Sequence, residues 1–397
     1  MENHREQGEL VFQGFKQLAS KCMIPNDRRP SQSTGEMVNV ERVGPTEAKI
    51  YLTQLQSNLL PLLHQQLTSL SGLLDHSDLQ GDHLDSTLRS ILVIQMEVED
   101  SLDQIKGALY ILCPEKPDEV VPNQTDDQHD EHIKLFRLHG LNKLFTFQLF
   151  NNLRLRFWGS RRLIEQLGLA REECHYPIDI LSSRRILSGH SDLIESTLRK
   201  AIKWINGSEL DNLQERWSIH LMDIDILLRD LSRRSPPGNP KSAPAIELAD
   251  SLIAVMKLSR MFFSKLSERG MNLKRLPMFT KMSSDQLEKL AQSASNLRND
   301  LVKLRSILMS ETFNVNFRHG LLLETVNQLK TSLEPALLSI FLYYIPIIPK
   351  DNDDIVRSGS SPVQTKDYFY AWFVEWFVTF NLSIQNFIKT VESMRDE

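Results

Sequence analysis

The stretch "LDSTLRSILVIQMEVEDSLDQIKGALYIL", residues 84–112, decides the fold class. Its apolar residues recur every three or four positions, which places them on one face of a single long α-helix. These residues are Leu84, Leu88, Ile91, Ile94, Val98, Leu102, Ile105, Leu109 and Leu112. Pro114 and Pro117 end the pattern, because proline has no backbone N–H to continue a helix.

The same spacing recurs in "SSDQLEKLAQSASNLRNDLVKLRSILMS", residues 283–310. Its heptad positions are Leu287, Leu290, Ala294, Leu297, Leu301, Leu304 and Leu308. Such a repeat could form a dimeric zipper. Its flanking positions are too apolar and too unpaired for a two-stranded coiled coil, so we expect it to pack inside its own bundle.

The composition agrees with helices throughout. The 397 residues include only 16 glycines and 17 prolines, which disfavours an all-β chain with its many tight turns. We therefore expect an all-α protein that forms one or two antiparallel helical bundles of about ten helices.

Stretches rich in helix breakers suggest the domain organisation. Residues 1–45 should form an N-terminal helix and a flexible linker. The segment "SRRSPPGNPKSAP", residues 232–244, contains four prolines and should separate a bundle at 46–234 from a second bundle at 243–397, unless the two pack as one unit.

Three local features have specific expectations. Pro61 should bend its helix, and Gly140 should break a helix that begins near His132. Ser191 is a plausible N-cap for a helix that closes at Gly207.

Charge and cysteine usage restrict the function. A net charge of −5 argues against a protein whose whole surface grips a polyanion, so nucleic acid is not the expected partner. Three widely spaced cysteines, Cys22, Cys113 and Cys174, are typical of reduced thiols in the cytosol or nucleus. The N-terminus lacks the basic start and continuous apolar run of a signal peptide, so we expect an intracellular protein.

Two apolar segments could suggest a membrane. Residues 336–348 are too short to span a bilayer, and residues 368–388 carry Glu375 and several amides. Both are expected to be core helices, with no membrane span.

The stretch "MFFSKLSERGMNLKRLPMFTKM", residues 261–282, combines aromatic and basic residues. On a helical wheel, Leu248, Leu252, Val255, Phe262 and Leu266 fall opposite the basic residues, which indicates a core side and a solvated side. Residues 257–281 hold seven basic and one acidic residue. If this region binds a partner or a phosphate, the contacts should be Lys274, Arg275 and Lys281, with Phe279 as the apolar contact; a solvated surface is the simpler interpretation.

Catalytic and metal motifs are weak. "DDQHD", residues 126–130, matches the magnesium motif of terpenoid synthases, but no second motif follows it. The acidic residues more simply precede a helix N-terminus. The histidines His129, His132 and His139 lack further ligands at a zinc spacing, and Glu172–His175 is a single Glu-x-x-His pair where di-iron bundles need two. We therefore assign no catalytic residue, no metal site and no cofactor.

Residues 201–228, "AIKWINGSELDNLQERWSIHLMDIDILL", and 252–277, "LIAVMKLSRMFFSKLSERGMNLKRLP", resemble an uncharacterised all-helical family expanded in rust fungi. "LLPLLHQQLTSL" (59–70) and "ALYILCP" (108–114) fit the same family. The resemblance covers residues 46–345 and rests on Trp204, Trp217, Phe262, Phe263 and Gly270. It implies no known activity. The layout is also remotely similar to cyclin-D-binding and vinculin-like bundles, which would imply an adaptor.

The sequence thus favours a non-enzymatic interaction or adaptor protein with an unidentified protein partner. Two alternatives stay open. One is a metal-dependent helical enzyme that uses the Asp-rich loop 126–130, with its pocket between helices. The other is nucleic-acid binding through the basic region 257–281.

Overall fold

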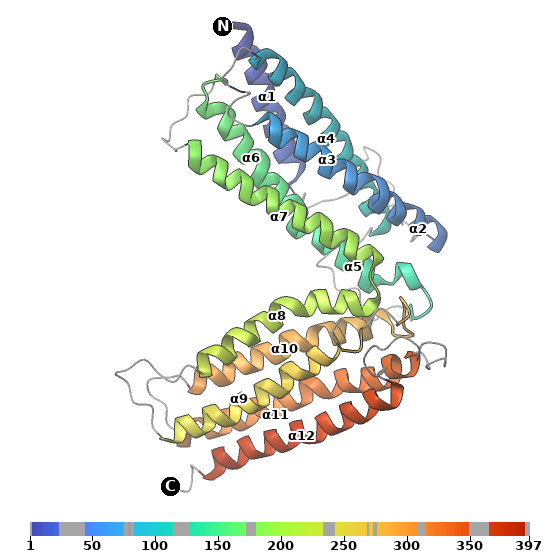
Figure 1. Ribbon diagram of the computed structural model, residues 1–397, viewed down its shortest axis with the longest axis vertical. Coiled ribbons are helices and arrows are strands. Elements are labelled where there is room, and N and C mark those ends of the chain that lie inside the picture. Colours follow the sequence, from blue (N-terminus) through green and yellow to red (C-terminus); the bar gives the residue numbers. More distant parts are fainter. Residues whose placement is uncertain are drawn as a thin grey trace, which may run out of the picture. The chain divides into compact units, whose positions relative to one another are not determined.

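The computed structural model describes residues 2–23, 44–74, 79, 83–113, 127–171, 180–232, 243–267, 270–272, 276–308, 315–348 and 365–393. Every regular element within these residues is a helix, which confirms the all-α prediction. The chain divides into two units (Figure 1): unit 1 comprises Met1–Thr125 with Asp130–Asn206, and unit 2 comprises Asp126–His129 with Gly207–Glu397.

Unit 1 contains seven labelled α-helices among its described residues. They are α1 (Glu2–Lys21), α2 (Pro45–Gln54), α3 (Leu60–Leu73), α4 (Leu84–Leu112), α5 (Leu135–Lys143), α6 (Phe150–Gln166) and α7 (Ile180–Asn206). The π-helical turn Leu55–Leu59 joins α2 to α3, and a second one, Leu144–Leu149, joins α5 to α6. The described part of unit 1 is therefore built from five rods.

Helix α1 belongs to the core of unit 1, so the prediction that residues 1–45 lie outside the bundle is wrong for this helix. Val11, Phe12 and Phe15 are fully buried. The ring of Phe15 lies 6.5 Å from that of Phe157 in α6. On its other side, α1 contacts α4, where Lys21 forms an ion pair with Glu99 at 2.9 Å.

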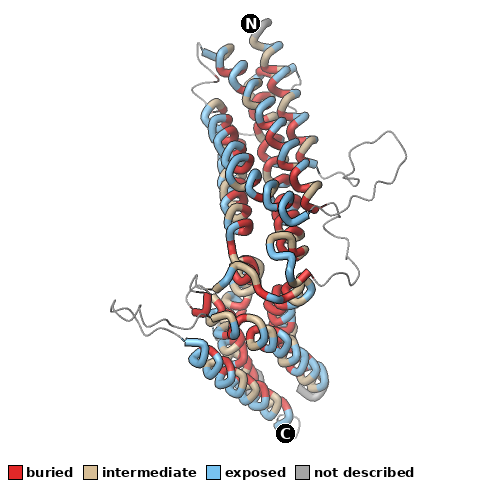
Figure 2. Tube along the Cα trace, turned by 90° about the vertical axis from the view of Figure 1, so that its right-hand side faces the viewer, coloured by how far each residue is buried: buried red, intermediate tan, exposed pale blue. Residues whose placement is uncertain are grey.

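Unit 2 contains five α-helices among its described residues. They are α8 (Glu209–Ser232), α9 (Ala243–Lys265), α10 (Ser284–Leu308), α11 (Val315–Ser339) and α12 (Lys366–Ser393). Neighbouring helices close a ring in the order α8, α10, α11, α12, α9 and back to α8. Figure 2 shows the buried residues following the inward faces of the helices.

The boundary between the units lies between Asn206 and Gly207, not in the proline-rich segment 232–244. The helices on either side of that segment, α8 and α9, pack together within unit 2. Gln214 of α8 donates a hydrogen bond of 2.7 Å to the carbonyl of Leu266, just after α9. The interior of that segment lies outside the described residues.

The leucine-rich heptad of α10 is packed inside unit 2, as expected. All seven of its heptad residues are buried. Trp217 of α8 is also fully buried, and its indole N–H donates to the carbonyl of Leu290 at 3.1 Å. The apolar face of α10 is therefore buried within the chain itself.

Each unit includes a pair of parallel helices, which a purely antiparallel bundle lacks. In unit 1, residues of α1 meet residues of α4 in ascending order, from His4 with Asp85 to Lys21 with Asp103. In unit 2, α8 runs parallel to α10. Three ion pairs record this register: Arg216–Glu288, Asp223–Arg298 and Asp230–Arg305.

Gly140 does not break its helix. The helix continues through α5 into α6, and the indole of Trp204 from α7 packs directly against this glycine. A Cβ at position 140 would lie 2.0 Å from the Trp204 ring, so the missing side chain permits the close approach of α7.

Ser191 is not an N-cap. Helix α7 begins at Ile180, and the hydroxyl of Ser191 donates to the carbonyl of Leu187 at 2.9 Å. Pro61 lies in the first turn of α3, directly after the π-helical turn, and the rod continues through it. A wider turn next to proline accommodates the missing N–H and the bulk of the ring.

The two apolar segments form helices of unit 2. Ile340 and Tyr344, together with Phe369, Phe373 and Phe380, are buried in its core. Among the helices that the structure describes, none combines the length and the apolar character needed to cross a bilayer.

Candidate functional site

In the described part of the basic region 257–281, the side chains of Arg260 and Lys265 are engaged within unit 2. Lys274 and Arg275 lie outside the described residues, Phe279 is half-buried, and Lys281 is exposed. The guanidinium of Arg260 pairs with Asp225 of α8, with Nε 3.0 Å from Oδ1. The apolar side of α9 is buried as predicted.

Lys265 at the end of α9 is also engaged within unit 2, contrary to the expectation of a solvated face. Its ammonium lies 4.3 Å from the ring centre of Tyr368, 5.1 Å from that of Phe369 and 5.0 Å from that of Trp372. It also donates to the Tyr368 hydroxyl at 2.8 Å. These contacts attach α9 to the start of α12 by cation–π attraction.

The Asp-rich loop has a structural role at Asp127, the one buried residue among its described positions 127–130. Asp127 is buried and accepts hydrogen bonds from the backbone N–H of Ser284, at 2.7 Å, and from the Ser284 hydroxyl. It therefore caps α10, which begins 157 residues later, rather than the helix that follows it in sequence. Asp126 lies outside the described residues, and His129 and Asp130 are exposed.

The described histidines do not form a metal centre. Burial, together with the charges of Arg137 and Lys49, lowers the pKa of His132. Among the described residues, no group of three or more His, Cys, Asp or Glu side chains could hold a metal ion. Glu172, Cys174 and His175 fall outside those residues.

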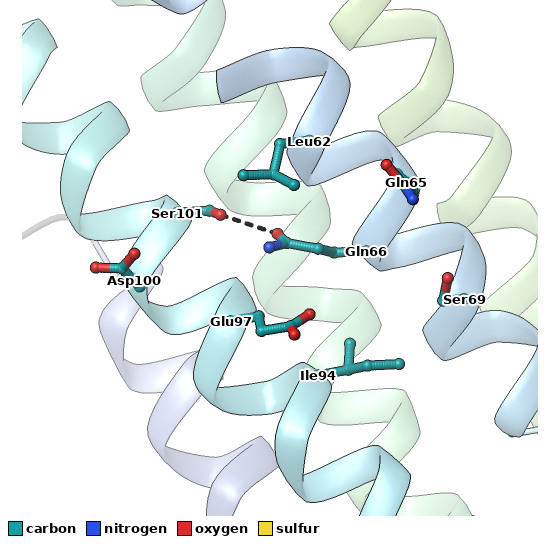
Figure 3. Close-up of a pocket in the computed structure, with 8 residues that line it drawn as sticks. All are labelled: Leu62, Gln65, Gln66, Ser69, Ile94, Glu97, Asp100 and Ser101. Atoms are coloured by element: carbon teal, nitrogen blue, oxygen red, sulfur yellow. Dashed lines mark hydrogen bonds between the residues drawn. The ribbon is translucent and has the colours of Figure 1, made fainter. Parts of the chain in front are cut away.

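An open groove of about 470 Å³ lies between α3 and α4 in unit 1. Eight residues line it: Leu62, Gln65, Gln66, Ser69, Ile94, Glu97, Asp100 and Ser101. In Figure 3, Leu62 and Gln66 from α3 and Ile94 and Glu97 from α4 project into the space between the two helices. We refer to this feature as the α3–α4 groove.

One hydrogen bond joins α3 and α4 at the groove. The Ser101 hydroxyl donates to the side-chain oxygen of Gln66 at 2.9 Å, and both residues are buried. This bond fixes the orientation of the Gln66 amide, because its oxygen is occupied by a donor from the neighbouring helix.

A buried arginine of α6 forms hydrogen bonds with the C-terminal part of α3. Arg156 of α6 donates to the carbonyl of Leu67 at 2.7 Å and to the hydroxyl of Ser71 at 2.6 Å. Burial lowers the pKa of Arg156 to about 10. The positive charge lies against the C-terminal end of α3, where carbonyl groups and the helix dipole favour a cation.

The groove has a negative charge. Glu97 and Asp100 contribute two carboxylates, and among the described residues that line the groove there is no Lys, Arg or His. Asp100 accepts a hydrogen bond of 2.7 Å from Gln104, one turn further along α4, while Glu97 is exposed. Leu62 and Ile94 add an apolar wall, so the groove suits a group that has an aliphatic stem and a cationic head.

The sequence contained only a faint signal for this groove. Gln66 lies between Leu63 and Leu70 in the apolar stripe of α3, and Ser101 precedes Leu102 in that of α4. A buried amide and a buried hydroxyl on facing helices require each other as partners. Gln66 and Ser101 could be recognised as parts of one site only from the structure, which shows that α3 packs against α4.

Comparison with family models gives two matches, neither with an assigned function. Residues 48–206 match a domain of unknown function (DUF8723), and residues 208–389 match a second domain of unknown function (DUF8721). No curated protein matches the chain. The junction of the two matches coincides with the boundary between the units, and the first match includes the α3–α4 groove but not α1.

Proposed function

We propose that the protein is a non-enzymatic interaction module whose α3–α4 groove accepts a lysine or arginine side chain of a protein partner. The observation that carries this proposal is the lining of the groove, which combines Glu97 and Asp100 with the aliphatic side chains of Leu62 and Ile94. The aliphatic stem would lie along the apolar wall, and the cation would reach the carboxylates.

The expected affinity of this contact alone is low. An ion pair in contact with water contributes about 0.2–1 kcal/mol. A single basic side chain therefore adds selectivity to a larger interface rather than binding strongly alone. This is typical of an adaptor that recognises a partner through several weak contacts.

An enzymatic role for the groove is less well supported. The two hydroxyls that line it belong to Ser69 and Ser101, and Ser101 donates to an amide oxygen rather than to a general base. A nucleic-acid partner also fits poorly, because the carboxylates of the groove repel phosphate and because Arg260 and Lys265 are engaged within unit 2.

The chemistry of the thiols supports an intracellular setting, in the cytosol or nucleus. Cys22 and Cys113 are buried and form no disulfide. Reducing compartments keep cysteine in this state.

The test uses a fluorescent helical peptide with two lysines four residues apart, and the same peptide with both lysines acetylated. Fluorescence anisotropy at low ionic strength should show binding of the first peptide only. In the Glu97→Gln/Asp100→Asn variant, the affinity should fall about fivefold, which corresponds to the loss of about 1 kcal/mol.

The control variant is Glu324→Gln/Glu392→Gln, which removes two exposed carboxylates from unit 2. It changes the net charge of the protein by the same amount, so it should bind the lysine peptide as the wild type does. Equal binding of the two peptides, or equal loss in both variants, would contradict the assignment of the groove.

A further inference from the structure

Helix α4 exposes one continuous face on the side away from the core of unit 1. Seven residues at alternating spacings of three and four are all exposed along it: Ser86, Arg89, Val93, Met96, Asp100, Asp103 and Gly107. We call this row the α4 stripe. On a helical wheel the row lies opposite Ile91, Val98 and Ile105, which are fully buried.

The centre of the α4 stripe is apolar. Val93 is 55% exposed, and Met96 is 72% exposed, the largest fraction for any large apolar side chain among the described residues. The flexible thioether of methionine adapts to many apolar surfaces. This pair is too small to select a partner by itself, so the charges on either side of it decide what fits.

Charges of opposite sign flank this centre at equal distances. Arg89 lies on its N-terminal side and Asp100 on its C-terminal side, each 5.5 positions from the midpoint between Val93 and Met96. That separation corresponds to about 8 Å along the helix. A second copy of the stripe, turned end for end, therefore places Arg89 of each copy against Asp100 of the other, and Val93 of each copy against Met96 of the other. The stripe is complementary to itself.

We propose that two copies of the chain pair through antiparallel α4 stripes, and that the basic side chain accepted by the α3–α4 groove is Arg89 of the second copy. This inference rests on the proposed function, because Glu97 and Asp100 are the carboxylates of the groove. In Figure 3, Glu97 projects toward α3, whereas Asp100 projects from the outer side of α4. The guanidinium of the second copy would bind these two carboxylates, with its aliphatic stem along α4.

The spacing of the stripe suits this contact. Rows that alternate between three and four residues pack knobs into holes when two helices cross at about 20°. An antiparallel pair related by a two-fold axis uses the same face of both copies, so each copy gives one arginine and receives one. Both grooves are therefore filled in the dimer.

The other carboxylates beside the stripe bind groups of their own chain. Asp103 pairs with Lys21, and Asp85 and Glu99 pair with residues of α1. The register of the two stripes therefore depends on Arg89 and on the carboxylates of the groove.

The dimer should be weak and sensitive to salt. Only about two heptads of each helix take part, which is short for a stable coiled coil. Ion pairs in contact with water add little and are screened by salt. We expect dimers at high protein concentration and low ionic strength, and fewer dimers as salt is added.

The first test is sedimentation equilibrium of the full chain at low and high salt. Arg89→Asp and Asp100→Arg each bring like charges together, so each variant alone should dimerise at least about fivefold more weakly than the wild type. A mixture of the two restores both ion pairs and should form a mixed dimer about as tight as that of the wild type. The control Arg229→Asp changes an exposed arginine of α8 and should dimerise as the wild type does.

The second test examines the register by crosslinking. In a background with Cys174→Ser, Arg89→Cys and Asp100→Cys are prepared as separate proteins. The introduced thiols should lie side by side in the mixed dimer, whereas two identical copies hold them about 16 Å apart along the helix. A disulfide-linked dimer should therefore form on mild oxidation of the mixture. Equal crosslinking of the mixture and of the single proteins would overturn the register.

Two outcomes would overturn the dimer itself. One is a wild type that stays monomeric at every concentration, and the other is a mixture of the charge variants that dimerises no better than each variant alone. Binding of the lysine peptide separates these failures from a failure of the proposed function. If a monomeric wild type binds the peptide through Glu97 and Asp100, the groove takes its basic residue from another protein, and if the peptide does not bind, the assignment of the groove is itself wrong.

Discussion

The carboxylate of Asp127 accepts hydrogen bonds from both the backbone N–H and the hydroxyl of Ser284, although the two residues are 157 positions apart. A residue from the loop between α4 and α5 thereby fixes the start of α10. The first turn of a helix leaves N–H groups without partners within the helix, and a buried carboxylate satisfies them strongly.

Replacement of Asp127 by alanine should destabilise unit 2 by about 1–2 kcal/mol, because the Ser284 N–H loses its acceptor. Urea denaturation should show a lower midpoint, and hydrogen exchange should accelerate in the first turn of α10. Asp130→Ala removes an exposed carboxylate of the same loop and should leave both measurements unchanged. Unaltered exchange in α10 after Asp127→Ala would exclude the capping role.

A methyl group at Gly140 should separate α5 from α7. The new Cβ would lie 2.0 Å from the Trp204 ring, and overpacking of this kind costs about 1–3 kcal/mol. Gly107 of α4 provides the opposite case, because a Cβ added there would meet no neighbouring atom within 4 Å. Gly107→Ala should therefore stabilise the protein by about 0.5–1 kcal/mol. Thermal unfolding of the two variants should therefore shift in opposite directions.

The stabilisation that comes from the ion pairs between α8 and α10 should depend on both residues of each pair. Asp223 pairs with Arg298 at 3.0 Å, and both side chains are about one-third exposed. Charge reversal by Asp223→Arg should cost about 0.5–1 kcal/mol, and the swapped double variant Asp223→Arg/Arg298→Asp should recover part of that loss. Chemical denaturation with urea at low and high salt measures the coupling, which salt should weaken. If the double variant loses as much stability as the single variants Asp223→Arg and Arg298→Asp lose in total, the two residues are not coupled.

Cys22 should be protected from alkylation in the folded protein. Burial raises the pKa of its thiol to about 12, against an ordinary value of 9.0. At pH 8 the reactive thiolate is therefore scarce, and iodoacetamide should modify Cys22 only after denaturation, as shown by peptide mass spectrometry. Rapid modification of the native protein at Cys22 would contradict its burial.

The same shift links stability to alkaline pH. The folded state holds the Cys22 proton more tightly than the unfolded state, so its contribution to stability is complete below pH 9.0 and is lost as the pH rises toward about 12. The free energy of unfolding of Cys22→Ala should consequently fall less steeply over this interval than that of the wild type. Urea titrations at pH 8 and pH 10 would show the difference.

The α3–α4 groove illustrates why sites were harder to predict than helices. The apolar stripe of 84–112 correctly predicts α4, yet two of its members, Leu84 and Ile94, are only half-buried, and Ile94 lines the groove. Periodicity specifies which face of a helix is apolar. It does not specify where the neighbouring helix ends its contact and leaves a groove.

The basic region shows the same limit. The wheel of α9 correctly separated a buried face from a basic face. It did not reveal that Lys265 would meet three aromatic rings of α12 about a hundred positions later, or that Arg260 would pair with Asp225. Partners that are remote in sequence depend on which helices become neighbours.

The sequence alone determined that the chain is helical and which residues of α9 and α10 are buried, because three- and four-residue spacing is a local property of the backbone. Only the tertiary structure decided the boundary at Asn206–Gly207, the place of α1 in the core and the parallel pairing of α8 with α10. Leucine-rich faces can be buried against almost any other apolar face. The choice among neighbours therefore rests on specific contacts, such as Trp204 on Gly140 and Asp127 on Ser284, which involve residues far apart in the chain.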